Sequence, residues 1–320
     1  MHRTSTYTIQ VTSDEPSALH VLADFIGARP VAMITDDTVD RIHGRRIADW
    51  LVQAGVPMQK ISVPAGEQSK SLPTATRLLD WLAHPDTQRR DILLAVGGGV
   101  VIDTVGWVAS AYMRGIPYIN LPTTLLAQVD AAIGGKVAAV QADILPTAAR
   151  EVPPDRARRR TLLGVSCAPH AVVSCIDWLA TLDRRQVRAG LAEAIKLAVI
   201  SSPELFGFIE DHLASLLALD RSSLRTLVHA TSAIKCALVE RDPYEVDLRR
   251  TLNFGHTVGH AVETVTGYGP VLHGEAVSYG MSVAVRMATT RGVLDPAVAA
   301  RITGVLRAAG ELGIRVPEEL

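Results

Sequence analysis

Short apolar runs alternate with helical patterns over the first half of the chain. Brief apolar runs that end at turn residues predict strands over 31–37, 60–68, 91–99 and 116–124. Between these runs, apolar residues recur at helical spacing over 39–54, 74–85 and 100–112. This alternation predicts a mostly parallel sheet with helices on both of its faces.

The pattern changes after Leu182, where strand-like runs give way to long helical patterns, as over 184–200 and 222–240. We therefore predict an α/β N-terminal Rossmann-like domain over 1–181 with a parallel sheet, followed by an all-helical C-terminal domain over 182–320. Residues 141–160 are rich in Ala, Pro and Arg and fit neither period. They are predicted to form a long surface loop.

The charge balance and the hydropathy exclude several classes of function. With 32 basic and 33 acidic side chains the formal net charge is -1, whereas a general nucleic-acid binder needs a basic excess. No apolar run approaches the roughly 20 residues that span a bilayer, and the first residues lack the apolar stretch of a signal peptide. Three cysteines without metal spacing argue against a disulfide framework. We expect a globular cytoplasmic protein with neither nucleic-acid nor membrane partners.

A glycine turn marks the predicted carboxyl edge of the sheet. Gly97, Gly98 and Gly99 lie between a strand and a helix, where backbone amides and the helix dipole can bind a pyrophosphate. The spacing is not that of the GxGxxG fingerprint, so a turn without a ligand stays open. Polar residues end two further strands and can contact the same ligand, although a helix cap is the alternative for the aspartates. They are Thr123, Thr124, Asp36 and Asp37.

The helical half carries candidate metal ligands. His256 and His260 are four residues apart and share one helix face. His273 follows, and Glu193 lies on an earlier predicted helix. A carboxylate and two imidazoles with one open position form a catalytic zinc site. The third histidine can instead bind substrate or transfer a proton.

Lysine is scarce and occurs near these polar signals. Only five of the 32 basic residues are lysines, and an ammonium is not interchangeable with a guanidinium where a single donor must reach a buried ligand. Lys196 follows Glu193 by three residues, and Lys136 follows two glycines in an apolar context. Arg249 precedes Asn253, with Arg250 the more solvent-exposed of the two arginines. Cations at these places predict an anionic substrate, phosphorylated or carboxylated or both.

From Val31 to Met281 the chain resembles the 3-dehydroquinate synthases and the wider sugar phosphate cyclases, which share a fold with glycerol dehydrogenase-like enzymes. The segments that carry the resemblance are ITDDTV, PAGEQSK, VGGGVVIDTVGWVASAYMRG, LPTTLLAQVDAAIGGK, RAGLAEAIK, LRRTLNFGHTVGH and LHGEAVSYGM. Their combination is far more specific than the glycine turn alone.

The resemblance implies a role for each matching residue. The residues that would hold NAD are Asp36, Glu67, Lys70, Gly98, Gly99, Asp103, Thr123 and Thr124, beside Gly97 of the same turn. Zinc or cobalt would be bound by Glu193, His256 and His273. The substrate pocket would be lined by Asp130, Lys136, Lys196, Lys235, Arg249, Asn253 and His260. Arg114 would reach the phosphate site of a neighbouring subunit, which implies a homodimer.

The resemblance also implies a redox-neutral reaction. A substrate hydroxyl is oxidised by NAD, phosphate is eliminated, the hydride is returned, and an intramolecular aldol step closes a carbocycle, so the enzyme is a carbon–oxygen lyase. Matches to Lys235 and Arg249 favour a substrate that carries a carboxylate, namely a heptulosonate 7-phosphate or its amino analogue. With that substrate the chain would act in aromatic or aminocyclitol biosynthesis.

The chain departs from the family pattern in two places. The interval from Lys136 to Gly164 spans 28 residues, about twice that of the family, and Arg160 and Thr161 replace a family lysine–asparagine pair. The chain also ends at Leu320, before the C-terminal helices of the family, so a more open pocket is expected.

Three alternatives to the heptulosonate cyclase therefore stay open. They are a secondary-metabolism cyclase that acts on a heptulose or hexose phosphate, a polyol dehydrogenase on the same fold, and a silent NAD-binding relative. A polyol dehydrogenase needs no cluster of anion-binding lysines, and a silent relative needs no set of metal ligands.

Overall fold

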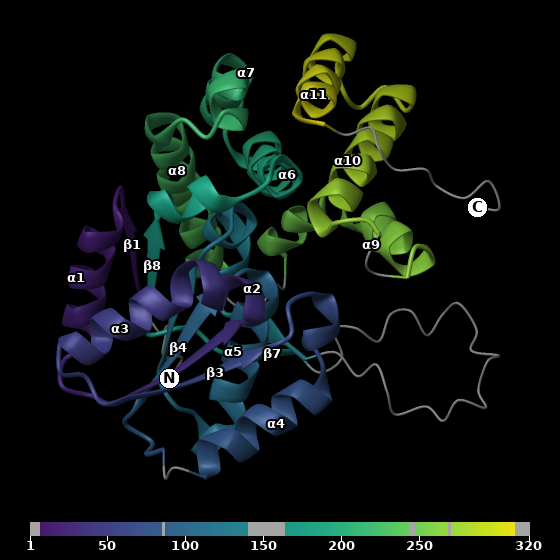
Figure 1. The fold of residues 1–320 in the computed structure, drawn as a ribbon. Helices are drawn as coiled ribbons and strands as arrows, with labels where there is room; N and C mark the ends of the chain where they lie inside the picture. Colours follow the sequence, from purple (N-terminus) through teal and green to yellow (C-terminus); the bar gives the residue numbers. More distant parts are fainter. Residues whose placement is uncertain (1–6, 85–86, 140–163, 243–246, 268–269, 311–320) are drawn as a thin grey trace, which may run out of the picture. The chain divides into compact units, whose positions relative to one another are not determined.

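The computed structural model describes residues 7–84, 87–139, 164–242, 247–267 and 270–310. The chain forms two compact units (Figure 1). The first comprises Met1–Thr123 and Ala131–Trp178, and the second comprises Thr124–Asp130 and Leu179–Leu320. The whole of the predicted loop over 141–160, with Arg160 and Thr161, lies outside the described residues.

The first unit contains a six-stranded sheet in the order β1-β8-β5-β4-β2-β3, and every neighbouring pair is parallel. The strands are β1 (Thr8–Thr12), β2 (Val31–Asp36), β3 (Met58–Val63), β4 (Ile92–Gly97), β5 (Tyr118–Pro122) and β8 (Ala171–Cys175). A separate antiparallel pair is formed by β6 (Lys136–Ala138) and β7 (Gly164–Ser166).

Helices cover both faces of this sheet. The helical segments of the first unit are α1 (Glu15–Ile26), α2 (Asp37–Val39), a π-helical turn (Asp40–Gly44), α3 (Arg45–Gln53), a 3-10 turn (Glu67–Ser69), α4 (Leu72–Ala83), α5 (Gly99–Ala111) and a 3-10 turn (Tyr112–Arg114), with a further 3-10 helix (Ile176–Thr181) at the boundary with the second unit. On one face, Leu22 of α1 and Leu51 of α3 belong to the same buried cluster as Met33 and Leu94 of the sheet. Helix α5 packs against β4 and β5, with α4 beside it. Because side chains alternate along a strand, each central strand packs side chains against the helices on both faces of the sheet.

The predicted fold class is confirmed, with corrections at individual elements. The four predicted strands are present, and the helix expected over 39–54 begins at Asp37 and contains a π-helical turn. The strands β1, β6, β7 and β8 and the helix α1 were not predicted. Asp14 caps α1 by accepting the amide of Ser17 at 2.8 Å, Pro16 stands in its first turn, and Gly27 follows its end. These are recognisable signals for helix ends.

The strand order places a topological switch between β2 and β4. From β2 the chain continues to β3 on one side, whereas β4, β5 and β8 lie on the other. Open α/β sheets bind ligands at the carboxyl ends of strands at such a point. Asp36 ends β2 and Gly97 ends β4, so two candidate cofactor residues stand at neighbouring strand ends.

The second unit consists of helices joined by turns, with no strand among its described residues. Its helices are α6 (Arg184–Ser201), α7 (Pro203–Leu217), α8 (Arg221–Arg241), α9 (His256–Val265), α10 (His273–Thr290) and α11 (Pro296–Ala309), with a 3-10 turn over Leu248–Asn253. Helix α10 contacts α6, α9 and α11, and α6 also contacts α7 and α8. Helices α6 and α10 are therefore the central elements around which the side chains of this unit are arranged.

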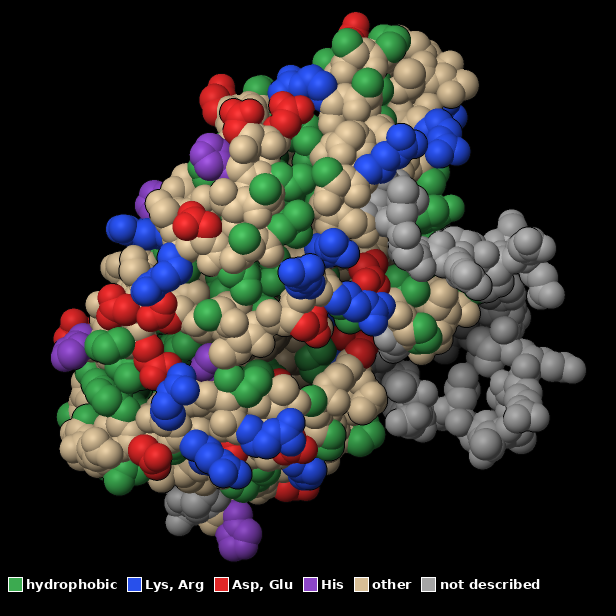
Figure 2. All heavy atoms as spheres, turned by 45° about the horizontal axis from the view of Figure 1, so that its top comes forward, with side chains coloured by type: hydrophobic (Ala, Val, Ile, Leu, Met, Phe, Trp, Pro, Cys, Tyr) green, Lys and Arg blue, Asp and Glu red, His purple; other side chains and the backbone are tan. Residues whose placement is uncertain are grey.

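The surface carries charges of both signs. Figure 2 shows blue Lys and Arg side chains interspersed with red Asp and Glu side chains on the displayed face, consistent with 32 basic and 33 acidic residues in the sequence. None of the helices described here combines the length and the apolar character needed to cross a bilayer.

A buried histidine makes the stability of the first unit depend on pH. His43 is 3% exposed, and burial, aided by the nearby Arg46 guanidinium, lowers its pKa from 6.5 to about 4. The unfolded chain therefore binds a proton more readily than the folded chain between these values. The stabilisation is fully present above pH 6.5 and is lost as the pH falls towards 4.

We expect His43→Gln to reduce this pH dependence. Denaturant unfolding at pH 6.5 and at pH 4 should show a smaller loss of stability for the variant, by up to about 3 kcal/mol. His20→Gln serves as the control, because His20 is exposed. An identical loss in wild type and His43→Gln would contradict the expectation.

Candidate metal centre

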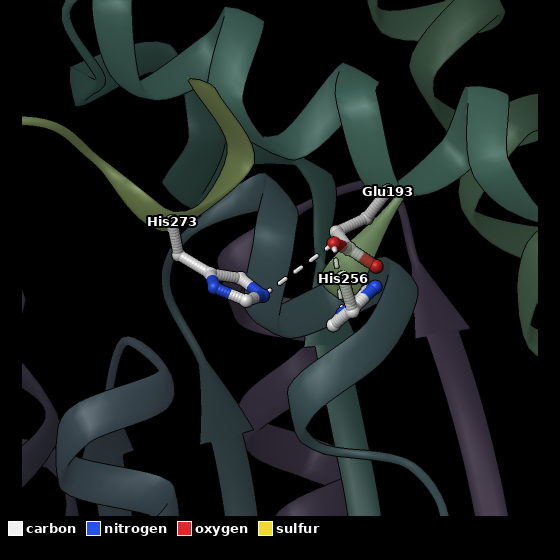
Figure 3. A group of neighbouring side chains, drawn as sticks. All are labelled: Glu193, His256 and His273. Carbon is white, nitrogen blue, oxygen red and sulfur yellow. Dashed lines mark ion pairs between the residues drawn. The ribbon is translucent and has the colours of Figure 1, made fainter. Parts of the chain in front are cut away.

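Three candidate ligands converge in the second unit from three different helices. Glu193 projects from α6, His256 begins α9 and His273 begins α10 (Figure 3). Nε2 of His273 lies 3.6 Å from Oε1 of Glu193, and Nε2 of His256 lies 3.9 Å from the same oxygen. The ligand atoms of the three side chains all lie within 4.8 Å of one another. The arrangement offers two imidazole nitrogens and one carboxylate, the donor set of a catalytic zinc site.

Two glycines permit this convergence. A Cβ at Gly274 would overlap the backbone carbonyl oxygen of Ala189 in α6, and a Cβ at Gly280 would overlap that of Gly255 before α9. Both obstacles are backbone atoms, which cannot rotate away. Glycine at these positions lets the first turns of α10 approach α6 and α9 closely enough for His273 to face Glu193.

Glu193 is a buried carboxylate whose first oxygen lacks a hydrogen-bond donor among the described residues. Its side chain is 0% exposed, and its second oxygen forms an ion pair with Lys196 one turn later. Burial alone would raise the pKa of Glu193, but Lys196 and the two imidazoles outweigh it, so the net shift is downward. A buried, ionised oxygen without a donor is costly, and a bound cation would compensate it.

The two histidines present their Nε2 atoms to this oxygen because their Nδ1 atoms face other acceptors. Nδ1 of His256 lies 3.2 Å from the carbonyl oxygen of Phe254, and Nδ1 of His273 lies 3.2 Å from Oε1 of Glu263. Burial lowers the pKa of His256 to about 4. Its imidazole is therefore neutral at pH 7, with a lone pair available for a metal.

His260 lies beside the two histidine ligand candidates without sharing the Glu193 cluster. Its ring centroid is 5.3 Å from that of His256 and 6.0 Å from that of His273. With Glu263 and His273 it forms a second group of converging donor atoms. The structure therefore brings all three sequence-predicted histidines together, but His260 is exposed and does not belong to the group of donor atoms around Glu193.

A second buried ionic group lies in the same unit. Nζ of Lys235 on α8 lies 2.5 Å from both the Oδ1 and the backbone oxygen of Asp130. Burial alone would raise the pKa of Asp130. The attraction of Lys235 and Lys196 lowers it by more than burial raises it, so the net shift is downward. Burial lowers the pKa of Lys235 despite the opposing effect of Asp130. For Lys196, burial is outweighed by Glu193 and Asp130, so its pKa rises.

Arg249 is buried, which excludes a role as a solvated surface cation. It is 2% exposed and stands in the 3-10 turn Leu248–Asn253, whose start is held by Asp242. The Oδ2 of Asp242 accepts the amides of Asp247 and Arg249 at 3.0 Å each. Arg250 and Asn253 are exposed, as expected for Arg250.

The candidate cofactor residues of the first unit cluster at strand ends. Asp36 accepts the amides of Thr38 and Val39 at 2.9 Å each, which confirms a helix-cap role for one of the two aspartates. Lys70 forms an ion pair with Asp103 of α5. Thr123 is buried, and its hydroxyl has no hydrogen-bond partner among the described residues. Gly98 is the N-cap residue of α5, so the unpaired amides of the first turn of α5 follow directly after the end of β4.

The remaining predicted positions are distributed between the two units. Lys136 begins β6 and is exposed in the first unit, and Glu67 begins a 3-10 turn there. Thr124 belongs to the second unit. Arg114 is exposed and has a φ of 65°, directly after Met113 at 49°. Two successive residues in the left-handed region hold the Arg114 side chain at an exposed turn.

Glu263 is a site residue that the sequence reasoning missed. It is buried and contacts His273 directly. Its position, seven residues after His256 and three after His260, places it on the same helix face as both. This spacing could have identified Glu263 as a site residue from the sequence.

Family models match both halves of the chain. The 3-dehydroquinate synthase N-terminal model matches residues 60–145, and the 3-dehydroquinate synthase C-terminal model matches residues 190–316. The chain belongs to the 3-dehydroquinate synthase family of sugar phosphate cyclases. The 3-dehydroquinate synthase of Pelotomaculum thermopropionicum is 40% identical over 299 residues, which cover 92% of this chain and 76% of the relative.

Other members of the family are named for different products. The 2-epi-valiolone synthase of Actinosynnema mirum is 52% identical over 308 residues, which cover 96% of this chain and 77% of the relative. Among solved structures, the 2-epi-5-epi-valiolone synthase ValA from Streptomyces hygroscopicus subsp. jinggangensis, with NAD+ and Zn2+ bound, matches with a TM-score of 0.86. It is 30% identical, and the match covers 99% of this chain and 84% of that chain.

Proposed function

We propose that the chain is an NAD- and zinc-dependent sugar phosphate cyclase that releases phosphate from a heptulose 7-phosphate. The observation that carries the metal assignment is the buried Oε1 of Glu193, which lacks a hydrogen-bond donor among the described residues while two imidazole Nε2 atoms face it. Zinc in the ValA structure supports the choice of metal. When bound, zinc and NAD supply a Lewis acid for a substrate hydroxyl and a reversible hydride acceptor.

The proposed NAD site is the switch point of the sheet in the first unit. The helix α5 begins directly after the glycine turn, so its unpaired amides suit a pyrophosphate. The acidic and polar groups around it suit a ribose and a nicotinamide. These residues are Asp36, Glu67, Lys70, Gly97, Gly98, Gly99, Asp103, Thr123 and Thr124.

Thr123→Val tests the cofactor site without disturbing the fold. The hydroxyl of Thr123 is buried without a partner among the described residues, so its removal should leave the free energy of unfolding unchanged or raise it by up to about 1 kcal/mol. If this hydroxyl bonds NAD, the same change should weaken NAD binding by roughly tenfold. Calorimetric titration of NAD and denaturant unfolding measure the two effects. Unchanged NAD affinity would remove Thr123 from the site.

Ionic side chains of the second unit would transfer protons to and from the substrate. Lys196 is held beside Glu193, and Lys235 is held beside Asp130, so each cation has a fixed position near the candidate metal ligands. A lysine or histidine beside a reacting hydroxyl can accept its proton and return it later. We assign this role to Lys235, whose pKa is lowered, and to His260, with Lys196 as a protonated donor to substrate oxygens and Asp130 and Asn253 orienting substrate hydroxyls.

The phosphate of the substrate needs cationic partners. We assign Lys136 to this role, because a phosphate dianion is bound by ammonium groups. Arg114 is exposed at its left-handed turn, and we propose that it completes the phosphate site of a second copy in a homodimer. Elimination of phosphate from carbon then breaks a carbon–oxygen bond, which is a lyase step.

Two observations favour a heptulose phosphate over the heptulosonate. The 2-epi-valiolone synthase is 52% identical to this chain, against 40% for the 3-dehydroquinate synthase. Asp130 also occupies two of the three N–H donors of Lys235, which leaves that ammonium poorly placed to bind a substrate carboxylate. The heptulosonate stays the second candidate, because Arg249 is buried and a guanidinium binds a carboxylate in a bidentate manner.

The two substrates can be compared directly. Purified protein with NAD and zinc is given a heptulose 7-phosphate or a heptulosonate 7-phosphate, and released phosphate is measured. Higher kcat/KM with the heptulose phosphate is expected. Preference for the heptulosonate would restore the carboxylate assignment, and no release from either would contradict the proposed cyclase activity.

A further inference from the structure

We infer that Glu263 is a positioning residue that fixes His273 in the orientation and tautomer that bind the metal. The inference rests on the metal site proposed above. Glu263 is not one of the three proposed ligands, but it would orient one of them, His273.

The two nitrogens of the His273 ring face two different carboxylates. Nδ1 lies 3.2 Å from Oε1 of Glu263, and Nε2 lies 3.6 Å from Oε1 of Glu193. Glu263 is buried on α9, whereas the side chain of His273 is 35% exposed at the first residue of α10. A partly exposed ring at a helix start has rotational freedom, and a buried carboxylate can remove it.

The hydrogen bond also selects the tautomer. A neutral imidazole carries one N–H, and only its other nitrogen has a lone pair for a metal. When the Nδ1–H of His273 donates to Glu263, the lone pair is left on Nε2, on the side of Glu193. A carboxylate partner also makes the imidazole more basic and therefore a better ligand.

His256 gives an internal comparison. Its Nδ1 faces the carbonyl oxygen of Phe254, a neutral backbone acceptor only two residues away. That restraint joins residues two positions apart, and its acceptor is a backbone atom that a side-chain mutation does not remove. The restraint on His273 is a side chain from another helix, and it can therefore be removed by mutation.

Glu263 could instead be a ligand itself, since His260, Glu263 and His273 also converge. That arrangement would use Nδ1 of His273 as the ligand atom and leave the buried Oε1 of Glu193 uncompensated. The observed geometry favours the Glu193 centre, and the two roles predict different results for Glu263→Gln.

The purified full chain is first freed of metal with a chelator. Its zinc affinity is then measured by competition with a chromophoric chelator. Glu263→Ala should weaken zinc binding by about 10- to 100-fold, the usual effect of losing an outer partner of a ligand histidine. Glu263→Gln should stay within about threefold of wild type, because its amide oxygen still accepts the Nδ1–H. Glu210→Gln is the matched control, since Glu210 is an ion-paired carboxylate of the same unit that pairs with Arg301, and its zinc affinity should equal that of wild type.

A double-mutant cycle shows whether Glu263 acts through His273. In a His273→Ala background, Glu263→Ala should cost no further zinc affinity. Cobalt absorption spectra should also change for Glu263→Ala and stay near wild type for Glu263→Gln. If Glu263→Ala does not fold, Glu263→Asp replaces it, because the shortened carboxylate no longer reaches Nδ1 and should weaken zinc binding by about tenfold.

The outcomes separate this inference from the proposed function. Wild-type zinc affinity in a folded Glu263→Ala or Glu263→Asp variant would overturn the positioning role. Equal, severe losses in Glu263→Ala and Glu263→Gln would make Glu263 a direct ligand and also overturn it. Stoichiometric zinc retained by His273→Ala alone would instead overturn the metal site itself.

Discussion

Replacing His273 with alanine is expected to abolish stoichiometric zinc binding and to leave NAD binding intact. The change removes one of two imidazole donors that face the buried Oε1 of Glu193. Zinc affinity should fall by more than about 100-fold, the upper range for losing an outer partner alone. The proposed NAD residues lie almost wholly in the other unit, so calorimetric titration with NAD should give the wild-type affinity. Zinc content after dialysis measures the first effect.

His229→Ala is the matched control for this experiment. His229 lies on α8 in the same unit and is exposed, so its removal should change neither zinc content nor NAD affinity. A His273→Ala protein that keeps one zinc per chain would show that Glu193, His256 and His273 are not the ligand set. Loss of NAD binding in the same variant would show that the two sites do not form independently.

Gly274→Ala is expected to destabilise the chain by about 2–3 kcal/mol, the usual cost of inserting a group into a packed core. The added Cβ would overlap the carbonyl oxygen of Ala189, and backbone atoms on both sides must move apart. Because Gly274 follows His273 and Ala189 precedes Glu193 by one turn, the displacement would separate two metal ligands. Denaturant unfolding of the zinc-free protein and zinc titration should both register the change.

Gly304→Ala separates packing from helix propensity. Gly304 lies in α11, and a Cβ there meets nothing within 4 Å. The same substitution should therefore stabilise the chain by up to about 1 kcal/mol, because alanine favours a helix over glycine. Equal effects of the two substitutions would contradict the argument that close contact between α6 and α10 builds the site.

The sequence was most informative where a structural signal is local. The strands β2, β3, β4 and β5 and the helices between them follow from periods of apolar residues within short windows. In contrast, β1 pairs with β8 across more than 150 positions, and no local pattern reports such pairing. Helix α1, in contrast, has local capping signals at Asp14 and Gly27 that the sequence alone can report.

The same distinction applies to the site. The i, i+4 spacing of His256 and His260 and the i, i+3 spacing of Glu193 and Lys196 could be read from the sequence. Which histidines face Glu193 depends on how α9 and α10 pack against α6, and that packing depends on close backbone approach at two glycines. The ion pair between Lys235 and Asp130 joins residues 105 positions apart and was likewise beyond local reasoning.

The most direct test of the proposed function follows phosphate and NADH together. Purified protein with zinc and NAD is mixed with a heptulose 7-phosphate, and phosphate release is measured in parallel with absorbance of NADH. We expect phosphate release over many turnovers without accumulation of NADH, because the hydride returns to the product before release. NADH that accumulates in step with substrate consumption, without phosphate release, would identify a dehydrogenase and contradict the assignment as a redox-neutral cyclase.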